Sequence, residues 1–174
     1  DTAAMLDATH GADPGAPCLL PAPERPFLEY AGLNPKPLKI GYTVSSPLKA
    51  QVDPSCVQAV QSAAKLLESL GHMVEEASPE IDGESVARCY FMLYFGEVAA
   101  DIEELKSVVG RPLNHHDTEE TTWALNLLGK AFSAGDFVLA RRQWNTFSRQ
   151  MAKFNEKYDL YMTPTIASLP PRIG

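Results

Sequence analysis

The densest group of potential metal ligands in the chain is the stretch His115-His116-Asp117-Thr118-Glu119-Glu120. Imidazole and carboxylate groups bind zinc or iron. Adjacent histidines rarely both point at one ion, however, and the stretch lacks the i, i+4 histidine pair that shares one helix face. Helix capping by Asp117, with Glu120 reaching back to the cap, explains the acids without a metal. We therefore predict a helix start at Asp117 and no metal site.

Two adjacent serines, Ser45-Ser46, could offer nucleophilic hydroxyls. A serine nucleophile needs backbone amides close to the developing oxyanion, and flanking glycines give that access. Here Pro47 and Leu48 follow instead. We interpret the pair as polar residues in a turn between a strand and a helix. The alternative is a ligand contact at the C-terminal end of a parallel strand.

The apolar run from Cys89 to Tyr94 is the best candidate for a substrate pocket, because it is apolar on more than one side and carries two phenols that could orient a ligand. A second candidate is Trp123. The predicted substrate-binding residues are therefore Cys89, Tyr90, Phe91, Tyr94 and Trp123. Core packing is the alternative for each, since buried aromatic side chains dominate protein cores.

These residues need elements to position them, and the clearest are two strands and a helix. Residues 38–44 alternate apolar with polar or small side chains, which predicts a strand. Asp53 suits an N-cap and Pro54 the first position of a helix that Gly71 ends. Residues 72–77 form a second predicted strand. A strand, a helix and a strand joined by short turns predict a parallel, right-handed βαβ unit.

The rest of the chain is predicted to be largely helical. A short helix follows Asp1, and seven prolines between residues 11 and 37 predict an extended surface connection. Further helices are expected over 85–109, from 117, and over 136–158, with a third strand at 159–162. The last helix carries the aromatic stripe Trp144/Phe147/Met151/Phe154, which we interpret as core rather than as a binding groove. Together these elements predict an α/β fold, divided into residues 1–37 and 38–174.

Composition narrows the class of protein. Of the 174 residues, 45% are apolar and 21% are charged, which is typical of a globular domain, and the net charge of −7 argues against a nucleic-acid binder. No apolar run is long enough to span a membrane. Cys18, Cys56 and Cys89 are odd in number and lack a C-x-x-C spacing. They predict reduced thiols, and hence a cytoplasmic location.

Two stretches resemble segments of the amidase signature family: Asp1-Thr2-Ala3-Ala4-Met5-Leu6-Asp7, and Tyr158-Asp159-Leu160-Tyr161-Met162-Thr163-Pro164-Thr165. Between them, the strand near Ile40 and the helix from Pro54 are similar to the family's spacer. Residues 118–123 and 158–160 also look similar to members that act on 6-aminohexanoate cyclic dimer. The resemblance implies an α/β segment of the amidase signature fold, with a mixed β-sheet flanked by helices.

The resemblance also implies a function for a parent protein. Family members hydrolyse amides with a Ser–Ser–Lys triad, which lies upstream in a lysine-bearing strand and a Gly/Ser-rich loop. No residue here matches the triad, so the chain is expected to contain no catalytic residue and to be inactive alone. The expected partners are a small amide substrate and the remainder of the amidase chain, without metal or organic cofactor, nucleic acid or membrane; a homodimer is left open. Two alternatives are a non-catalytic amidotransferase-type subunit or interaction module, and a small-molecule-binding α/β domain.

Overall fold

The computed structural model describes residues 1–173. The chain divides into two compact units, Asp1–Pro37 and Leu38–Gly174. The first unit contains helix α1 (Thr2–Thr9) and a five-residue helix, α2 (Phe27–Ala31). The Asp7 carboxylate accepts hydrogen bonds from the amides of Phe27 and Leu28, at 2.6 and 3.0 Å. Helix α2 interrupts the predicted extended connection. Its first amides are satisfied by a residue 20 positions away, so local sequence does not reveal it.

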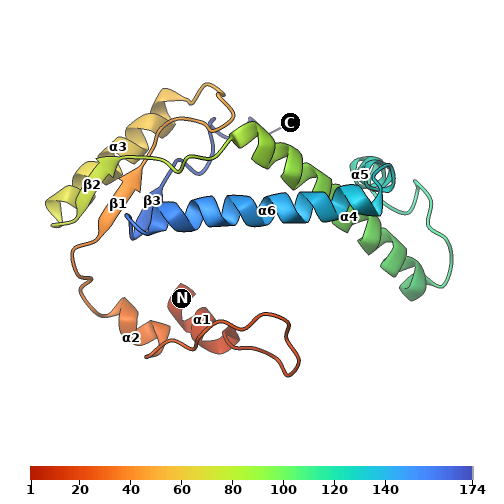
Figure 1. The fold of residues 1–174 in the computed structure, drawn as a ribbon, viewed down its shortest axis with the longest axis horizontal. Coiled ribbons are helices and arrows are strands. Elements are labelled where there is room, and N and C mark those ends of the chain that lie inside the picture. Colours follow the sequence, from red (N-terminus) through yellow and green to blue (C-terminus); the bar gives the residue numbers. More distant parts are fainter. Residues whose placement is uncertain (174) are drawn as a thin grey trace. The chain divides into compact units, whose positions relative to one another are not determined.

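The second unit is built on three parallel strands in the order β2-β1-β3 (Figure 1). Strand β1 (Lys39–Tyr42) pairs with β2 (Met73–Glu76), Ile40 lying opposite Val74, and with β3 (Leu160–Met162), Ile40 lying opposite Leu160. Ile40 is only 1% exposed. The three predicted strands are confirmed, and the carboxyl ends of all three meet at one edge of the sheet.

Helix α3 (Pro54–Ser69) connects β1 to β2 and confirms the predicted βαβ unit. The Asp53 carboxylate accepts a hydrogen bond from the Ser55 amide at 2.8 Å, and Pro54 occupies the first turn. Val60 and Ala64 are the buried residues of this helix. The amphipathic pattern and the cap together fix this element.

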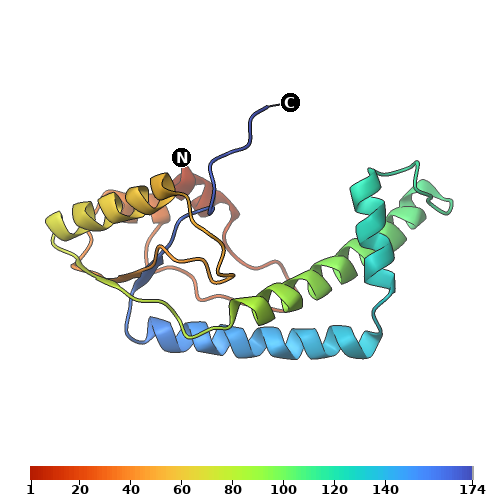
Figure 2. The same ribbon diagram turned by 90° about the horizontal axis from the view of Figure 1, so that it is seen from above.

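Helix α4 (Gly83–Val109) packs against both α5 (Glu120–Lys130) and α6 (Ala134–Asn155), and both views show α5 beside the C-terminal part of α4 (Figures 1 and 2). Asp82 caps α4 through the Ser85 amide, and Gly110, with φ of 75°, ends it. Ser133 and Asp136 form a reciprocal capping box at the start of α6. Within residues 1–173, no helix is both long and apolar enough to cross a bilayer.

The core lies where α6 meets α4 and the sheet. Cys89, Ala140 and Phe147 are buried together between α4 and α6. At the end of α6, the rings of Phe154 and Tyr158 stack at 4.6 Å beside the strand residue Gly41. Phe147 and Phe154 are 8% and 9% exposed, so these two members of the aromatic stripe are core residues as predicted.

Candidate functional site

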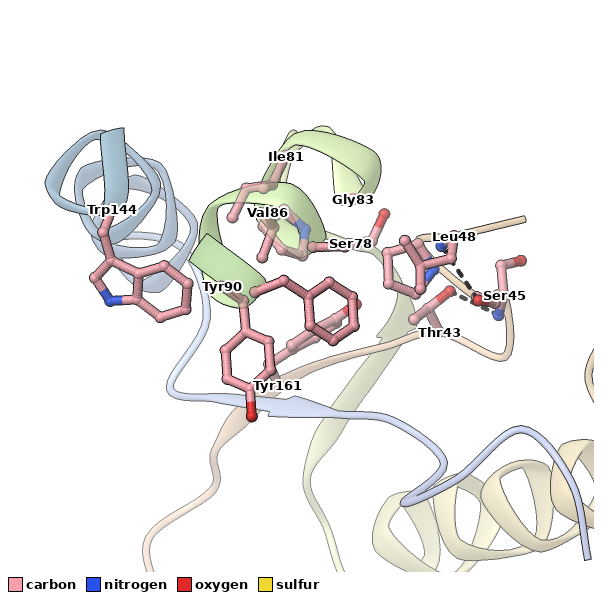
Figure 3. A pocket seen from close by; sticks show the side chains of 15 residues that line it. Thr43, Ser45, Leu48, Ser78, Ile81, Gly83, Val86, Tyr90, Trp144 and Tyr161 are labelled. Atoms are coloured by element: carbon pink, nitrogen blue, oxygen red, sulfur yellow. Dashed lines mark hydrogen bonds between the residues drawn. The ribbon is translucent and has the colours of Figure 1, made fainter. Parts of the chain in front are cut away.

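A cavity of about 570 Å³ lies at the carboxyl edge of the parallel sheet (Figure 3). We call it the carboxyl-edge cavity. It is lined by residues after β1 and after β2, by one residue of β3, and by side chains of α4 and α6. In open α/β sheets, ligands bind outside the carboxyl ends of the strands, where the loops after them converge. The position of this cavity therefore makes it the candidate site.

Hydroxyl groups gather on the side of the cavity formed by the strand ends. Thr43, Ser45 and Ser46 follow β1, and Ser78 follows β2. Thr43 Oγ1 accepts a hydrogen bond from the Ser45 amide at 3.2 Å, and Ser46 Oγ accepts one from the Leu48 amide at 3.2 Å. The Ser45-Ser46 pair thus lies in the predicted turn and also lines the cavity, and a ligand contact by the pair stays a prediction.

The opposite walls are apolar and aromatic. They come from Tyr90 and Phe91 on α4, Trp144 on α6 and Tyr161 on β3, with Ile81 and Val86 beside them. Burial raises the pKa of the Tyr161 phenol, which is therefore uncharged at neutral pH. Trp144 is 39% exposed, so this member of the aromatic stripe lines the cavity instead of filling the core.

A second cavity of about 330 Å³ continues from the first towards the segment after β3. The two share the wall formed by Thr43, Ser45, Ser46, Pro47 and Tyr161. The second cavity adds residues Thr163 to Ala167, and the Ala167 carbonyl accepts a hydrogen bond from the Asp53 amide at 2.8 Å. The turn after β1 therefore lines both cavities.

The predicted substrate-binding residues occupy different surroundings. Tyr90 and Phe91 line the carboxyl-edge cavity, and the Tyr94 ring stacks on Tyr90 at 5.7 Å. Cys89 is buried, its thiol donates to the Ala140 carbonyl at 3.0 Å, and burial raises the pKa of that thiol. Trp123 is half-buried on α5. A role in binding substrate stays a prediction for all five.

The predicted site residues do not include Thr43, Ser78, Trp144 or Tyr161. They belong to four separate segments, and only the strand order brings them to one edge. A usable signal was present for Thr43 and Ser78, since polar residues directly after predicted parallel strands lie at the carboxyl edge. Trp144 had no such signal, because its spacing equals that of the core residues on α6.

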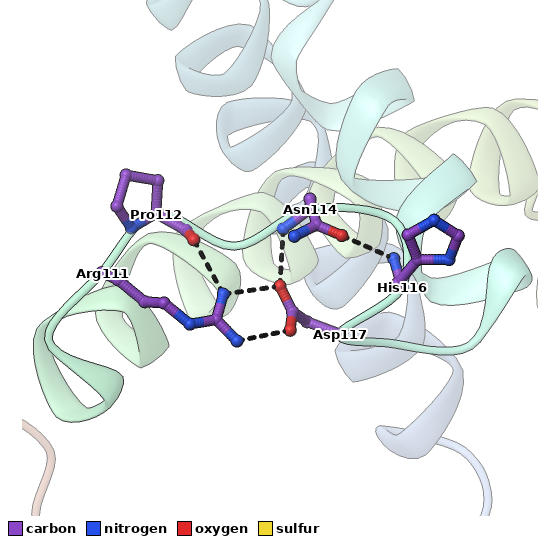
Figure 4. A network of polar contacts seen from close by, with 5 residues as sticks. All are labelled: Arg111, Pro112, Asn114, His116 and Asp117. Atoms are coloured by element: carbon purple, nitrogen blue, oxygen red, sulfur yellow. Dashed lines mark hydrogen bonds and ion pairs between the residues drawn. The ribbon is translucent and has the colours of Figure 1, made fainter.

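Asp117 does not cap a helix, which corrects the prediction for this segment. Helix α5 begins at Glu120 with Glu119 at the N-cap position. The Asp117 carboxylate instead accepts two hydrogen bonds from Arg111, at 2.7 and 2.9 Å, and one from the Asn114 amide at 2.9 Å (Figure 4). The Arg111 guanidinium holds the pKa of Asp117 well below its usual range. Among residues 1–173, no three His, Cys, Asp or Glu side chains are grouped to hold a metal ion.

The parallel sheet, its flanking helices and the cavity at its carboxyl edge place the chain in the α/β class. Comparison with known proteins gives the family. The family model described as Amidase matches residues 1–174. The chain is 30% identical over 177 residues to the 6-aminohexanoate-cyclic-dimer hydrolase of Pseudomonas sp. strain NK87, covering 100% of this chain and 36% of that protein. The chain belongs to the amidase family.

Solved structures agree with this assignment. A 6-aminohexanoate cyclic dimer hydrolase complexed with substrate superposes with a TM-score of 0.91 at 29% identity, over 99% of this chain and 36% of that one. A bacterial aryl acylamidase of the amidase signature family superposes with a TM-score of 0.82 at 19% identity, again over 99% of this chain and 36% of the other, and shows the fold alone. The chain therefore has the fold of part of an amidase signature enzyme and spans about a third of the length of these relatives.

Proposed function

We propose that this chain is the central to C-terminal part of an amidase that hydrolyses a carbon–nitrogen amide bond. The observation that carries the proposal is the match of the whole chain to the amidase family, together with the close superposition on a 6-aminohexanoate cyclic dimer hydrolase. The proposed partners are a small amide substrate and the remainder of the amidase chain, and the proposed location is the cytoplasm.

The proposed chemistry uses a Ser–Ser–Lys triad outside residues 1–174. One serine oxygen attacks the amide carbonyl while its proton passes through the second serine to the lysine. The carbon–nitrogen bond then breaks, the amine leaves with that proton, and water hydrolyses the acyl-enzyme. This route needs neither a metal nor an organic cofactor. The present chain supplies the scaffold and, through the carboxyl-edge cavity, a wall of the substrate pocket.

The test is an amide hydrolysis assay on the full-length protein that contains this chain. We expect it to release p-nitroaniline from p-nitroanilides or to open the ring of 6-aminohexanoate cyclic dimer, and to lose that activity when the upstream nucleophilic serine is replaced by alanine. The 174-residue chain is the matched control and should show no turnover. Turnover by this chain that is abolished by replacing one of its own residues would overturn the placement of the triad.

A non-catalytic subunit gives a different result in the same assay. The full-length protein would then hydrolyse no amide, with or without an upstream serine, and would elute with a partner on gel filtration. That outcome would favour the interaction module over the enzyme.

A further inference from the structure

We infer that the carboxyl-edge cavity selects amides whose acyl group is uncharged, with Ser45 as the hydrogen-bonding residue for a polar atom on that group. This inference rests on the proposed function and names the substrate class of the same site. It is drawn from the charge and the hydrogen bonds of the cavity lining.

The first step is the charge of the walls. Among residues 1–173, the side chains that line the cavity include no Asp, Glu, Lys, Arg or His. Its two phenols are Tyr90 and Tyr161, and the pKa of Tyr161 is raised by burial, so that ring stays neutral. A carboxylate or ammonium group placed here would lose part of its water without gaining a counter-charge from these walls, which is unfavourable. The walls that this chain supplies therefore favour neutral acyl groups over charged ones.

The second step is the state of the hydroxyl groups. Within the described residues, the hydrogen bonds of the turn after β1 occupy Thr43 Oγ1 and Ser46 Oγ, and none involves Ser45 Oγ (Figure 3). Ser45 borders both cavities at once. A hydroxyl can donate one hydrogen bond and accept others. Ser45 is thus the residue of this turn whose side chain is free to bind a carbonyl or N–H of a ligand lying along the two cavities.

The third step is the shape of the apolar part. Phe91 on α4, Trp144 on α6 and Tyr161 on β3 give the cavity three aromatic walls from different elements. Aromatic faces pack well against methylene chains and rings and bury a large area. A neutral alkyl or ring-containing acyl group fits this lining, with any polar atom directed to the serine turn.

The charge preference is tested on the full-length protein with three six-carbon p-nitroanilides. Hexanoyl is neutral, 6-aminohexanoyl is cationic and adipoyl, with a free carboxylate, is anionic. We expect kcat/KM for the hexanoyl compound to exceed the other two by about tenfold or more, because the charge of each of them loses water without a partner in these walls. Equal rates, or a preference for either charged compound, would overturn the inference while leaving the proposed amidase activity intact.

A substitution that adds a positive charge to the cavity tests the charge preference at a single residue. Phe91 is 50% exposed on α4, so lysine at this position can be tolerated and would give the cavity a cation. We expect Phe91→Lys to raise the rate on the adipoyl compound relative to the hexanoyl compound by about tenfold. Val108→Lys, on the same helix at a residue that is 79% exposed, is the control and should leave the ratio unchanged. An unchanged ratio in Phe91→Lys would place the acyl group elsewhere.

Ser45 is tested with 5-oxohexanoyl-p-nitroanilide, which is neutral and carries one added carbonyl. We expect Ser45→Ala to lower kcat/KM for this compound about three- to tenfold more than for the hexanoyl compound, the worth of one hydrogen bond. Ser69→Ala is the control, since the Ser69 hydroxyl donates within its own helix. Loss of activity on both compounds to the same extent, or on neither, would remove Ser45 from this role.

The charge preference of the cavity can be tested even if the full-length protein hydrolyses no amide. If the full-length protein hydrolyses none of these compounds, its thermal unfolding is followed with hexanamide, 6-aminohexanamide and adipamic acid. A rise in Tm with hexanamide that exceeds the rise with the two charged amides, and that Phe91→Lys reverses for adipamic acid, supports the neutral pocket without hydrolysis. The same rise with all three compounds, or with none, overturns it.

Discussion

At the scale of single residues, Asn126 in α5 is an amide with 0% exposure whose Oδ1 and Nδ2 have no hydrogen-bond partner among the described residues. An unpaired buried polar group destabilises the folded state by about 1–3 kcal/mol relative to an apolar group of similar size. The side chain lies on the helix that packs against α4. The folded state is therefore stabilised less by this contact than its burial suggests.

We accordingly expect Asn126→Leu to raise the free energy of unfolding by about 1–2 kcal/mol, measured by urea unfolding. Asn145→Leu is the matched control, because Asn145 is exposed on α6 and its replacement should change stability by less than about 0.5 kcal/mol. A loss of stability in Asn126→Leu beyond that of the control would mean that the amide makes a bond that holds α5 in place.

Tyr158 links α6 to the sheet through its hydroxyl. The hydroxyl donates to Glu75 Oε1 at 2.6 Å and accepts a hydrogen bond from Lys157 Nζ at 2.8 Å. We expect Tyr158→Phe to reduce the free energy of unfolding by about 1 kcal/mol, since the ring stays packed and only these bonds are lost. Tyr94→Phe is the control, with its ring 42% exposed, and should be neutral.

The same bonds set the pH response of Glu75. The hydrogen bond from Tyr158, and then the one from Lys157, hold the pKa of the Glu75 carboxyl below its ordinary value. A carboxylate with a lowered pKa stabilises the fold above its ordinary pKa, and that stabilisation disappears as the pH falls through the lowered value. The NMR titration of Glu75 should therefore move to higher pH in Tyr158→Phe. A titration unchanged by the substitution would contradict the bond.

At the scale of elements, the contact of α4 with α5 depends on glycine. A Cβ on Gly129 would overlap the carbonyl oxygen of Phe95, a backbone atom of α4 that cannot move aside alone. We expect Gly129→Ala to destabilise the protein by about 1–3 kcal/mol through separation of the two helices. Gly135→Ala in α6 meets only Ser133 Oγ at 3.5 Å and should be neutral or slightly stabilising, because alanine favours helix. Equal effects of the two substitutions in thermal unfolding would refute the close contact.

An ion-pair network joins the same two helices. Glu103 on α4 binds Lys106 at 2.6 Å and Lys130 of α5 at 2.6 Å, and these bonds, that of Lys106 first, lower the pKa of Glu103 from 4.5 to about 2. Its stabilising contribution should be complete above pH 4.5 and lost as the pH falls through about 2. In NMR titrations, we expect Lys106→Met to raise this pKa more than Lys130→Met. The reverse order would contradict the assignment of Lys106 as the stronger partner.

Helices and strands could be predicted from the sequence where the residues that mark their ends are close together in the chain. Asp53 and Pro54 mark the start of α3 by chemistry that needs no other part of the chain. The capping box of Ser133 and Asp136 is also a local signal, and it marks the start of α6 at Ala134, two residues before the predicted start. The prediction for Asp117 was wrong because a carboxylate near a helix start can either cap the helix or pair with a basic side chain. Here it pairs with Arg111. Which of these two roles a carboxylate takes depends on tertiary contacts.

At the scale of the whole molecule, the candidate site was only partly predictable for the same reason. Tyr90 and Phe91 could be named because they lie in one conspicuous run. Trp144 and Tyr161 could not, because their place in the cavity depends on how α6 and β3 return to the sheet. The family was recognisable from short stretches at both ends of the chain, and the match over residues 1–174 confirms it.

The strand order has a consequence for synthesis on the ribosome. Strand β1 lies at the centre of the sheet, yet it bonds to residues 120 positions later, where the Lys39 amide donates to Asp159. At about 5–20 residues per second, translation of that interval takes roughly 6–24 s. Until β3 is made, the edge of β1 that pairs with β3 has no strand beside it. Helices α4 to α6 are made in that interval, so the aromatic residues of α6 are made before the strand that completes their packing.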